Sequence, residues 1–168
     1  MKISLIGSMA SGKSTVGQCL AKKLNLPFYD TDTLIESKMG CSVSDIFAQH
    51  GETRFRKLET ETLTHLLTQP EDCIIATGGG IIKNPLHRSL LKKHSRVVFL
   101  DVSITTQLQR VEHDTSRPIL MVDNRTQKLE ILRQERLPLY QETAHYTLQV
   151  DLLDPDQLAQ KIQDNIRH

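Results

Sequence analysis

Residues 7–14, Gly7-Ser8-Met9-Ala10-Ser11-Gly12-Lys13-Ser14, form the stretch of this sequence that decides its fold. They match the pattern GxxxxGK[ST], a P-loop, in which glycines let successive main-chain N–H groups point at phosphate oxygens. The apolar run from Lys2 to Ile6 precedes the loop, and a helical pattern with Val16, Leu20 and Leu24 on one face follows it. The stretch therefore predicts a nucleotide-phosphate site between a strand and a helix, and a chance glycine-rich turn is the alternative.

Strands and helices alternate through the rest of the chain. We predict further strands at 26–29, 73–76, 97–100 and 146–150, and helices at 34–39, 52–67, 85–93, 105–112, 126–137 and 156–166, with a short helix between Ser42 and Gly51. This order predicts an α/β fold, a three-layer α/β/α sandwich with a mainly parallel five-stranded sheet. A ligand crevice is then expected at the carboxyl ends of the strands. We find no repeat or linker and expect one domain over residues 1–168.

Composition limits the partners of the chain. Lys and Arg number 21 against 20 Asp and Glu, so the net charge of +1 disfavours nucleic-acid binding. The three cysteines, Cys19, Cys41 and Cys73, fit neither a disulfide framework nor a metal motif, and we expect buried thiols in a reducing compartment. The apolar run at the N-terminus is too short to be a signal peptide or a membrane span. We therefore expect a cytoplasmic protein that binds no membrane.

A P-loop alone leaves GTPases, ATPase motors, nucleic-acid enzymes and small-molecule kinases open. The sequence has no NKxD-like segment to read guanine, and its charge disfavours a nucleic-acid motor. A small-molecule kinase fits best. In such an enzyme Lys13 reaches the β and γ phosphates of ATP, and the Ser14 hydroxyl binds Mg²⁺.

Three short motifs, two after predicted strands and one within a predicted helix, are candidates for a substrate site. Asp30 and Asp32 could hold metal and meet a hydroxyl, although two helix N-caps would look the same. Arg56, with Glu59 on the same helical face, could present a guanidinium to a carboxylate, although a solvated ion pair is the alternative. Residues 78–80, three glycines after a buried strand, could let a ligand approach the backbone or could form a simple turn.

Together these motifs resemble the shikimate kinase family: GSMASGKS, the DTD of 30–32, the FRxxE of 55–59, GGG, SRP and RLPLY occur in the family's order. The resemblance covers nearly the whole chain. It implies a P-loop NTPase fold of the nucleoside monophosphate kinase-like type and transfer of the γ-phosphoryl group of ATP to the 3-hydroxyl of shikimate, in aromatic amino-acid biosynthesis. Kinases of another small hydroxylated substrate, such as gluconate or a nucleotide, and a non-catalytic nucleotide-binding module remain alternatives.

The resemblance also implies roles for individual residues. Asp30 would hold Mg²⁺ through water, Asp32 would bind the attacking hydroxyl, and Arg56 and Arg136 would grip the substrate carboxylate. The implied substrate-binding set, within a region of about 31–60 and beyond it, is Asp32, Phe47, Phe55, Arg56, Gly78, Gly79, Gly80 and Arg136. The implied ATP-binding set is Ala10, Ser11, Gly12, Lys13, Ser14, Thr15, Arg110, Arg117 and Pro155, and the catalytic set is Lys13, Asp32 and Arg117.

Two further expectations concern the nucleotide side. Arg117, in a polar stretch at about 112–126 that resembles the family's mobile lid, would close over the γ-phosphate; a solvated loop arginine is the alternative. Ala10 stands where the family commonly has glycine, so the loop loses backbone freedom there, and we expect phosphate binding to survive the added methyl group. Nothing in the sequence requires more than a monomer.

Overall fold

A computed structural model describes residues 1–111 and 124–167 of the chain. Its five strands form one sheet in the order β2-β3-β1-β4-β5, and every neighbouring pair is parallel. The strands are β1 (Lys2–Ile6), β2 (Phe28–Asp30), β3 (Cys73–Ala76), β4 (Arg96–Asp101) and β5 (Tyr146–Gln149). The predicted α/β class and parallel sheet are confirmed.

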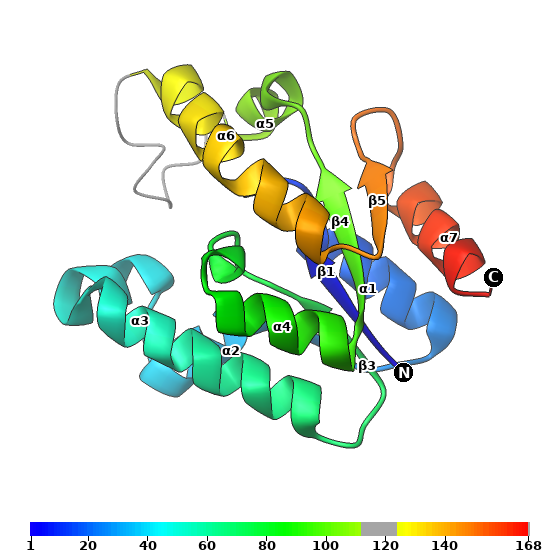
Figure 1. The fold of residues 1–168 in the computed structure, drawn as a ribbon, viewed down its shortest axis with the longest axis horizontal. Coiled ribbons are helices and arrows are strands. Elements are labelled where there is room, and N and C mark those ends of the chain that lie inside the picture. Colours follow the sequence, from blue (N-terminus) through cyan, green and yellow to red (C-terminus); the bar gives the residue numbers. More distant parts are fainter. Residues whose placement is uncertain (112–123, 168) are drawn as a thin grey trace.

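Helices cover both faces of this sheet. They are α1 (Lys13–Leu24), α2 (Thr31–Met39), α3 (Val43–Thr68), α4 (Pro85–His94), α5 (Ile104–Val111), α6 (Arg125–Thr143) and α7 (Pro155–Ile166), with one 3₁₀ turn, η1 (Ile81–Lys83). Figure 1 shows α1 beside α7, and α4 between α3 and α6. Each of these helix groups packs on its own side of the sheet, which gives the three layers.

The central strands are apolar on both sides because each side faces a separate core. Ile3 and Leu5 of β1 pack with α1 and α7, whereas Ile6 packs with α3 and α4. Ile74 and Ile75 of β3 divide in the same way. Successive strand residues point to opposite faces, so a parallel strand covered on both sides is a continuous apolar run.

Helix α6 extends past the end that we predicted at Leu137. Pro138 lies inside it, and the helix continues to Thr143. Proline is normally disfavoured inside a helix because it has no N–H for the backbone hydrogen bond to the preceding turn. Here Tyr140 and Thr143 are buried, and the Tyr140 ring stacks on Phe99 with centroids 4.7 Å apart. Packing beyond the proline therefore outweighs the local penalty.

Other boundaries also differ from the prediction. Helix α2 begins at Thr31 rather than at residue 34, because Asp30 caps it by accepting a hydrogen bond from the main-chain N–H of Thr33, 3.1 Å away. Strand β2 correspondingly ends at Asp30 instead of residue 29. Helix α3 contains a break at Gly51, where φ is 82° and ψ is 167°. The expected end of a short helix at Gly51 is thus seen as a kink, after which α3 resumes.

The cysteine prediction is wrong for two thiols. Cys73 is buried, but Cys19 and Cys41 are partly exposed, since each lies at the margin of a core rather than within it. All three are free.

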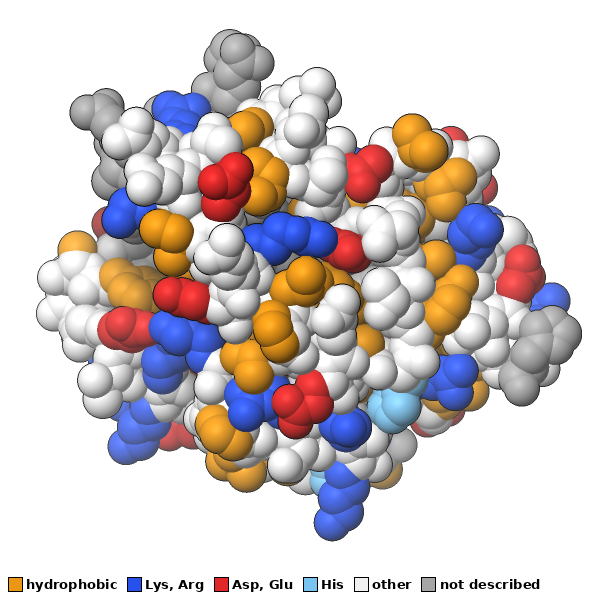
Figure 2. All heavy atoms as spheres, turned by 45° about the horizontal axis from the view of Figure 1, so that its top comes forward, with side chains coloured by type: hydrophobic (Ala, Val, Ile, Leu, Met, Phe, Trp, Pro, Cys, Tyr) orange, Lys and Arg blue, Asp and Glu red, His pale blue; other side chains and the backbone are white. Residues whose placement is uncertain are grey.

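The described surface carries charges of both signs. Figure 2 shows Lys and Arg side chains interspersed with Asp and Glu across the face that it presents. Within residues 1–111 and 124–167, no helix is both long enough and apolar enough to cross a membrane.

Candidate active site

Two clefts lie near the carboxyl ends of the strands, on either side of the P-loop. The larger has a volume of about 550 Å³ and is lined by Asp30, Asp32, Phe47, Phe55, Arg56, Gly78, Gly79, Gly80 and Arg136, together with Met9. The smaller has a volume of about 430 Å³ and is lined by Ala10, Ser11, Gly12, Thr15, Arg110 and Pro155. Met9 and Ala10 are neighbours in the chain but line different clefts. The P-loop therefore lies between a cleft lined by predicted substrate-binding residues and a cleft lined by predicted ATP-binding residues.

The shape of the P-loop is set by its backbone conformation and by the hydrogen bonds of Lys13. Gly12 and Ala10 both have left-handed backbones, with φ of 90° and 63°. Lys13 Nζ donates to the carbonyls of Gly7 at 2.5 Å and of Ser8 at 3.0 Å. The ammonium group thus lies over the loop at the N-terminal, electropositive end of α1, where an anion is favoured.

Ser14 and Asp30 meet beside the loop. The Ser14 hydroxyl donates to Asp30 Oδ2, while Asp30 Oδ1 accepts from the Thr33 N–H that caps α2. Both predicted roles of Asp30, helix cap and site residue, are therefore compatible. A hydroxyl and a carboxylate oxygen are the hard donors that Mg²⁺ prefers. Among the described residues no cluster of three or more His, Cys, Asp or Glu could hold a metal, so an ion here would need phosphate and water oxygens as well.

Arg56 and Glu59 form a largely buried ion pair. Arg56 Nη1 lies 3.0 Å from Glu59 Oε1, and the Glu59 side chain is only 1% exposed. Burial, and in smaller part the Asp32 carboxylate, raise the pKa of Glu59 to about 7 although Arg56 opposes this. Glu59 Oε2 has no hydrogen-bond partner within the described part of the chain. The alternative of a solvated surface pair is excluded.

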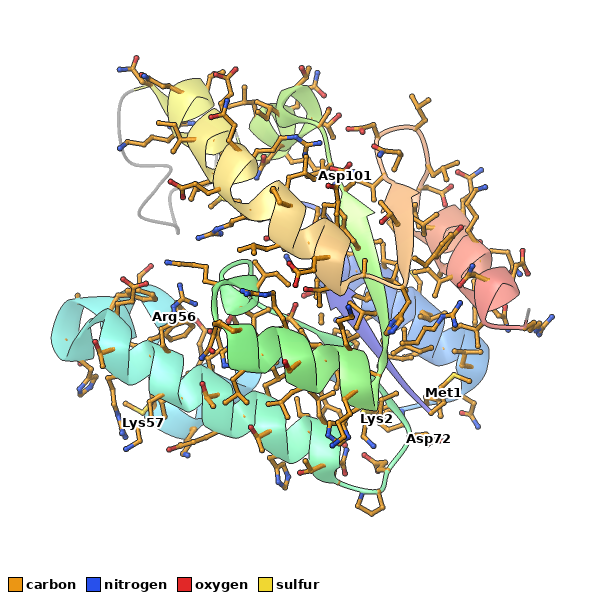
Figure 3. All side chains as sticks on the ribbon, viewed as in Figure 1. Met1, Lys2, Arg56, Lys57, Asp72 and Asp101 are labelled. Carbon is orange, nitrogen blue, oxygen red and sulfur yellow. The ribbon has the colours of Figure 1, made fainter. Side chains whose placement is uncertain are left out.

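Two aromatic rings flank Arg56. Its guanidinium carbon lies 6.0 Å from the Phe47 ring centroid and 5.3 Å from that of Phe55, and the two rings are 4.8 Å apart. Such contacts attract a cation to the ring faces. In Figure 3 Arg56 and its neighbour Lys57 point to opposite sides of α3. The two rings and Glu59 together position the Arg56 guanidinium group in the cleft.

Each glycine of the triplet lies against a different group of the site. A Cβ at Gly78 would lie 2.7 Å from Asp32 Oδ1, and one at Gly80 would lie 2.6 Å from Arg56 Nη2. A Cβ at Gly79 would lie 3.7 Å from Arg136 Nη1. At separations below 3 Å one of the two groups must shift, so the absent side chains at 78 and 80 allow Asp32 and Arg56 to lie this close to the backbone. A flexible turn does not explain this packing.

Tyr140 links α6 to the glycine triplet, residues 78–80. Its hydroxyl donates to the Gly79 carbonyl at 2.7 Å, and burial raises the pKa of Tyr140 to about 12, so the phenol keeps its proton. Arg136 lies one helical turn before Tyr140, on the same face of α6. We did not assign Tyr140 a role from the sequence; the only available signal was its place in RLPLY.

The smaller cleft is built on contacts between α5 and the loop. Arg110 Nη1 donates to the Ala10 carbonyl and Gln107 Nε2 to the Met9 carbonyl, each at 2.8 Å. Leu153 and Pro155 form part of the facing wall. Arg110 therefore borders this cleft, as expected, but its guanidinium also supports the loop backbone.

Some predicted residues are not described by the structure, and some residues of the larger cleft were not predicted. Arg117 and most of the proposed lid, residues 112–123, are not among the described residues. Cleft residues that we did not single out are Met9, Thr33, Glu36, Ser42, Val43, Ser44, Glu59 and Leu132. Met9 and Thr33 are next to predicted residues, and Met9 and Glu59 lie within motifs, whereas the other residues lie in neither position.

Comparison with known sequences gives a consistent result. The family model described as shikimate kinase matches residues 9–167. A shikimate kinase of Francisella tularensis subsp. holarctica is 42% identical over 160 residues, 95% of this chain and 91% of that protein. A shikimate kinase of Vibrio parahaemolyticus is 42% identical over 164 residues, 98% of this chain and 92% of that protein.

Solved structures agree. Shikimate kinase from Acinetobacter baumannii in complex with shikimate superposes with a TM-score of 0.94 at 42% identity, over 99% of this chain and 92% of that one. The Aquifex aeolicus enzyme gives a TM-score of 0.87 at 34% identity, over 99% and 96%. A deoxyadenosine kinase from M. mycoides, at 14% identity and a TM-score of 0.63 over the full length of both chains, shares the fold. With its P-loop, its cleft and this similarity along almost its whole length, the chain belongs to the shikimate kinase family.

Proposed function

We propose that this protein transfers the γ-phosphoryl group of ATP to the 3-hydroxyl of shikimate, giving shikimate 3-phosphate and ADP, in aromatic amino-acid biosynthesis. The observation that carries the proposal is a single cleft, bordered by a P-loop, in which Arg56 and Arg136 lie against neighbouring glycines. Such a cleft accepts a small carboxylic acid next to a bound nucleotide. The A. baumannii relative was solved with shikimate.

The carboxylate end of the substrate is assigned to the two arginines. A guanidinium offers a planar pair of donors that matches a carboxylate. Gly79 and Gly80 add main-chain contacts, while Phe47 and Phe55 provide an apolar wall. In this assignment residues of about 31–60 form most of the substrate-binding region.

The hydroxyl end is assigned to Asp32. Its carboxylate accepts the hydroxyl proton as the substrate oxygen forms a bond to the γ-phosphorus, and the bond between that phosphorus and the β–γ bridging oxygen breaks to release ADP. Asp32 lies against Gly78, which fixes its position relative to the acid-binding end. Catalysis then consists mainly of alignment, which this rigid packing supplies.

The nucleotide phosphates are assigned to residues 10–15, with Lys13 moving from its own loop carbonyls to phosphate oxygens. Arg110 and Pro155 are assigned to the adenine, and Arg117 to closing over the γ-phosphate. Ser14 and Asp30 would hold Mg²⁺, Asp30 through water, and the bound ion would offset phosphate charge.

The proposal is tested by incubating the protein with ATP, Mg²⁺ and shikimate and measuring ADP release against a reaction without shikimate. Shikimate methyl ester is the matched control, because it keeps every hydroxyl and removes the carboxylate charge. We expect turnover that depends on shikimate and is at least tenfold less efficient with the ester. Equal turnover of gluconate or a nucleoside monophosphate would indicate another kinase. ATP binding without any turnover would indicate a regulatory module.

The cellular setting is part of the same proposal. Free thiols and a requirement for ATP are consistent with a reducing cytoplasm. We propose that residues 1–168 act as one kinase domain and as a monomer, without nucleic-acid or membrane partners.

A further inference from the structure

His87 is a buried histidine that the proposed reaction does not use. It lies on α4 behind η1 and is 1% exposed. Its Nδ1 is 2.9 Å from the Ile81 carbonyl oxygen, and its Nε2 is 2.7 Å from Thr60 Oγ1 on α3. One imidazole thus bridges two segments that are 21 residues apart in the chain.

The partners determine where the imidazole carries its hydrogen. A carbonyl oxygen only accepts, so Nδ1 must be the N–H that binds Ile81. Burial, and in smaller part the positive charge of Arg56, lower the pKa of His87, so the ring is neutral at pH 7. Its Nε2 then has a lone pair and accepts the hydroxyl hydrogen of Thr60. Thr60 Oγ1 also lies 3.0 Å from the Arg56 carbonyl, and its single hydrogen can serve only one acceptor at a time.

Both segments joined by His87 carry one side of the acid-binding cleft. Ile81 directly follows Gly80, and Thr60 lies one helical turn after Arg56. Gly80 and Arg56 are the pair whose closest approach depends on the missing Cβ. A small separation of α3 from η1 would therefore open the space between the Arg56 fork and the Gly80 backbone.

A second polar link between these two segments is weaker. Lys83 Nζ lies 3.4 Å from Glu52 Oε1, with both side chains about half exposed. Exposed pairs of this kind contribute roughly 0–1 kcal/mol. Arg88 of α4 also binds the carbonyls of Ile82 and Lys83, which attaches η1 to α4 but not to α3.

We propose that neutral His87, as its Nδ1–H tautomer, is a positioning residue that clamps η1 to α3 and so sets the spacing between Gly80 and Arg56 for the substrate carboxylate. The inference rests on the proposed function. It predicts that loosening the clamp weakens binding of the acid while the nucleotide side is unaffected.

The test compares two conservative variants with a matched control. Thr60→Val removes the hydroxyl that serves Nε2, and His87→Asn places an amide N–H near the Nδ1 position but ends the bridge to Thr60. Thr68→Val is the control, because Thr68 Oγ1 makes the same backward bond on α3, to the Thr64 carbonyl at 2.7 Å, away from the cleft.

We expect both clamp variants to raise the KM for shikimate about 5- to 20-fold, with kcat and the KM for ATP within about twofold of wild type. The double variant should be no worse than the worse single variant, since both interrupt one bridge. Thr68→Val should behave as wild type. Folded variants with unchanged KM for shikimate, or with ATP and shikimate affected alike, would overturn the positioning role.

A second measurement does not depend on turnover. The ¹⁵N chemical shifts of His87 at pH 7 should show a protonated Nδ1 and an unprotonated Nε2. An Nε2–H tautomer or a charged ring would refute the proposal whatever the kinetics. A different outcome is possible in which wild-type protein has this tautomer but does not phosphorylate shikimate. That result would refute the proposed function, while the His87 contact between η1 and α3 would still be supported.

Discussion

The phenolic oxygen of Tyr140 lies 2.7 Å from the main-chain carbonyl oxygen of Gly79, and this contact joins α6 to the segment that follows β3. Arg136 approaches the same glycine from the same helix. The position of Arg136 relative to the glycine backbone therefore depends on a hydrogen bond made by another residue of the same helix.

Tyr140→Phe should weaken shikimate binding and slightly destabilise the fold. Removal of the hydroxyl leaves a partly buried carbonyl without this partner, which costs about 1–3 kcal/mol and lowers Tm by about 2–9 °C at this chain length. Thermal unfolding and the KM for shikimate measure the two effects. Tyr29→Phe is the control, since its hydroxyl binds Glu71 at the exposed surface. Equal loss in both variants would refute a specific role for Tyr140.

Asp32→Ala should abolish phosphoryl transfer while ATP affinity stays within about twofold of wild type. The variant removes the proposed acceptor of the hydroxyl proton, a role typically worth about 100- to 10,000-fold in rate, but leaves the P-loop intact. Turnover and calorimetric ATP binding measure this. Near-normal turnover would remove Asp32 from the mechanism.

Arg136→Ala should raise the dissociation constant of shikimate by about 10- to 100-fold, because a charge-assisted hydrogen bond contributes about 1.5–3 kcal/mol. ATP binding should not change. Lys57→Ala is the control, since Lys57 is exposed on the far side of α3 from the cleft. Loss of ATP binding with unchanged shikimate affinity would show that Arg136 has been assigned to the wrong ligand.

Glu59 should make the stability of the ligand-free protein depend on pH. Its pKa is raised from 4.5 to about 7, so the folded state holds a proton that the unfolded state releases between these values. The contribution of protonated Glu59 to the free energy of unfolding is fully present below pH 4.5 and is lost as pH rises through 7. The total loss is about 3 kcal/mol.

Glu59→Gln should remove that slope. Urea unfolding at pH 5, 6, 7 and 8 should show the free energy of unfolding of wild type falling relative to the variant as pH rises. Glu61→Gln, on the exposed part of the same helix, serves as control. A difference between wild type and Glu59→Gln that stayed constant over this range would contradict the prediction.

Ala10→Gly should stabilise the protein by up to about 1 kcal/mol, because Ala10 has φ of 63°, where a Cβ is strained. The added freedom of glycine in the unfolded chain offsets part of this gain. Thermal unfolding measures the net change, and a lower Tm would show that the methyl group makes favourable contacts that exceed the strain.

The sequence was sufficient for the order of the elements, since each followed from a local pattern, and most of the predicted cleft residues came from short motifs together with the resemblance to the shikimate kinase family. Strands β3 and β4 are unbroken apolar runs, and the P-loop motif requires a strand before it and a helix after it. Asp30 and the glycines were identified because they end or follow predicted strands, and Arg56 because it shares a helical face with Glu59.

What could not be predicted depends on contacts between distant segments. The extension of α6 past Pro138 needs the burial of Tyr140 against Phe99, which no local pattern contains. The burial of Glu59, which separates a site residue from a surface ion pair, arises only when α2, α3 and the β3 loop meet. The link from His87 to Thr60 likewise joins helices that are adjacent only in the folded chain.

The three consecutive glycines after β3 also limit how this protein can be re-engineered. Because Asp32 and Arg56 lie against Gly78 and Gly80, a side chain introduced at either glycine would require Asp32 or Arg56 to shift. Val43 and Ser44, which line the same cleft, are the positions at which new acid specificity could be sought. These two positions already carry side chains at the start of α3, so libraries directed at them should yield folded proteins more often than libraries directed at the glycines.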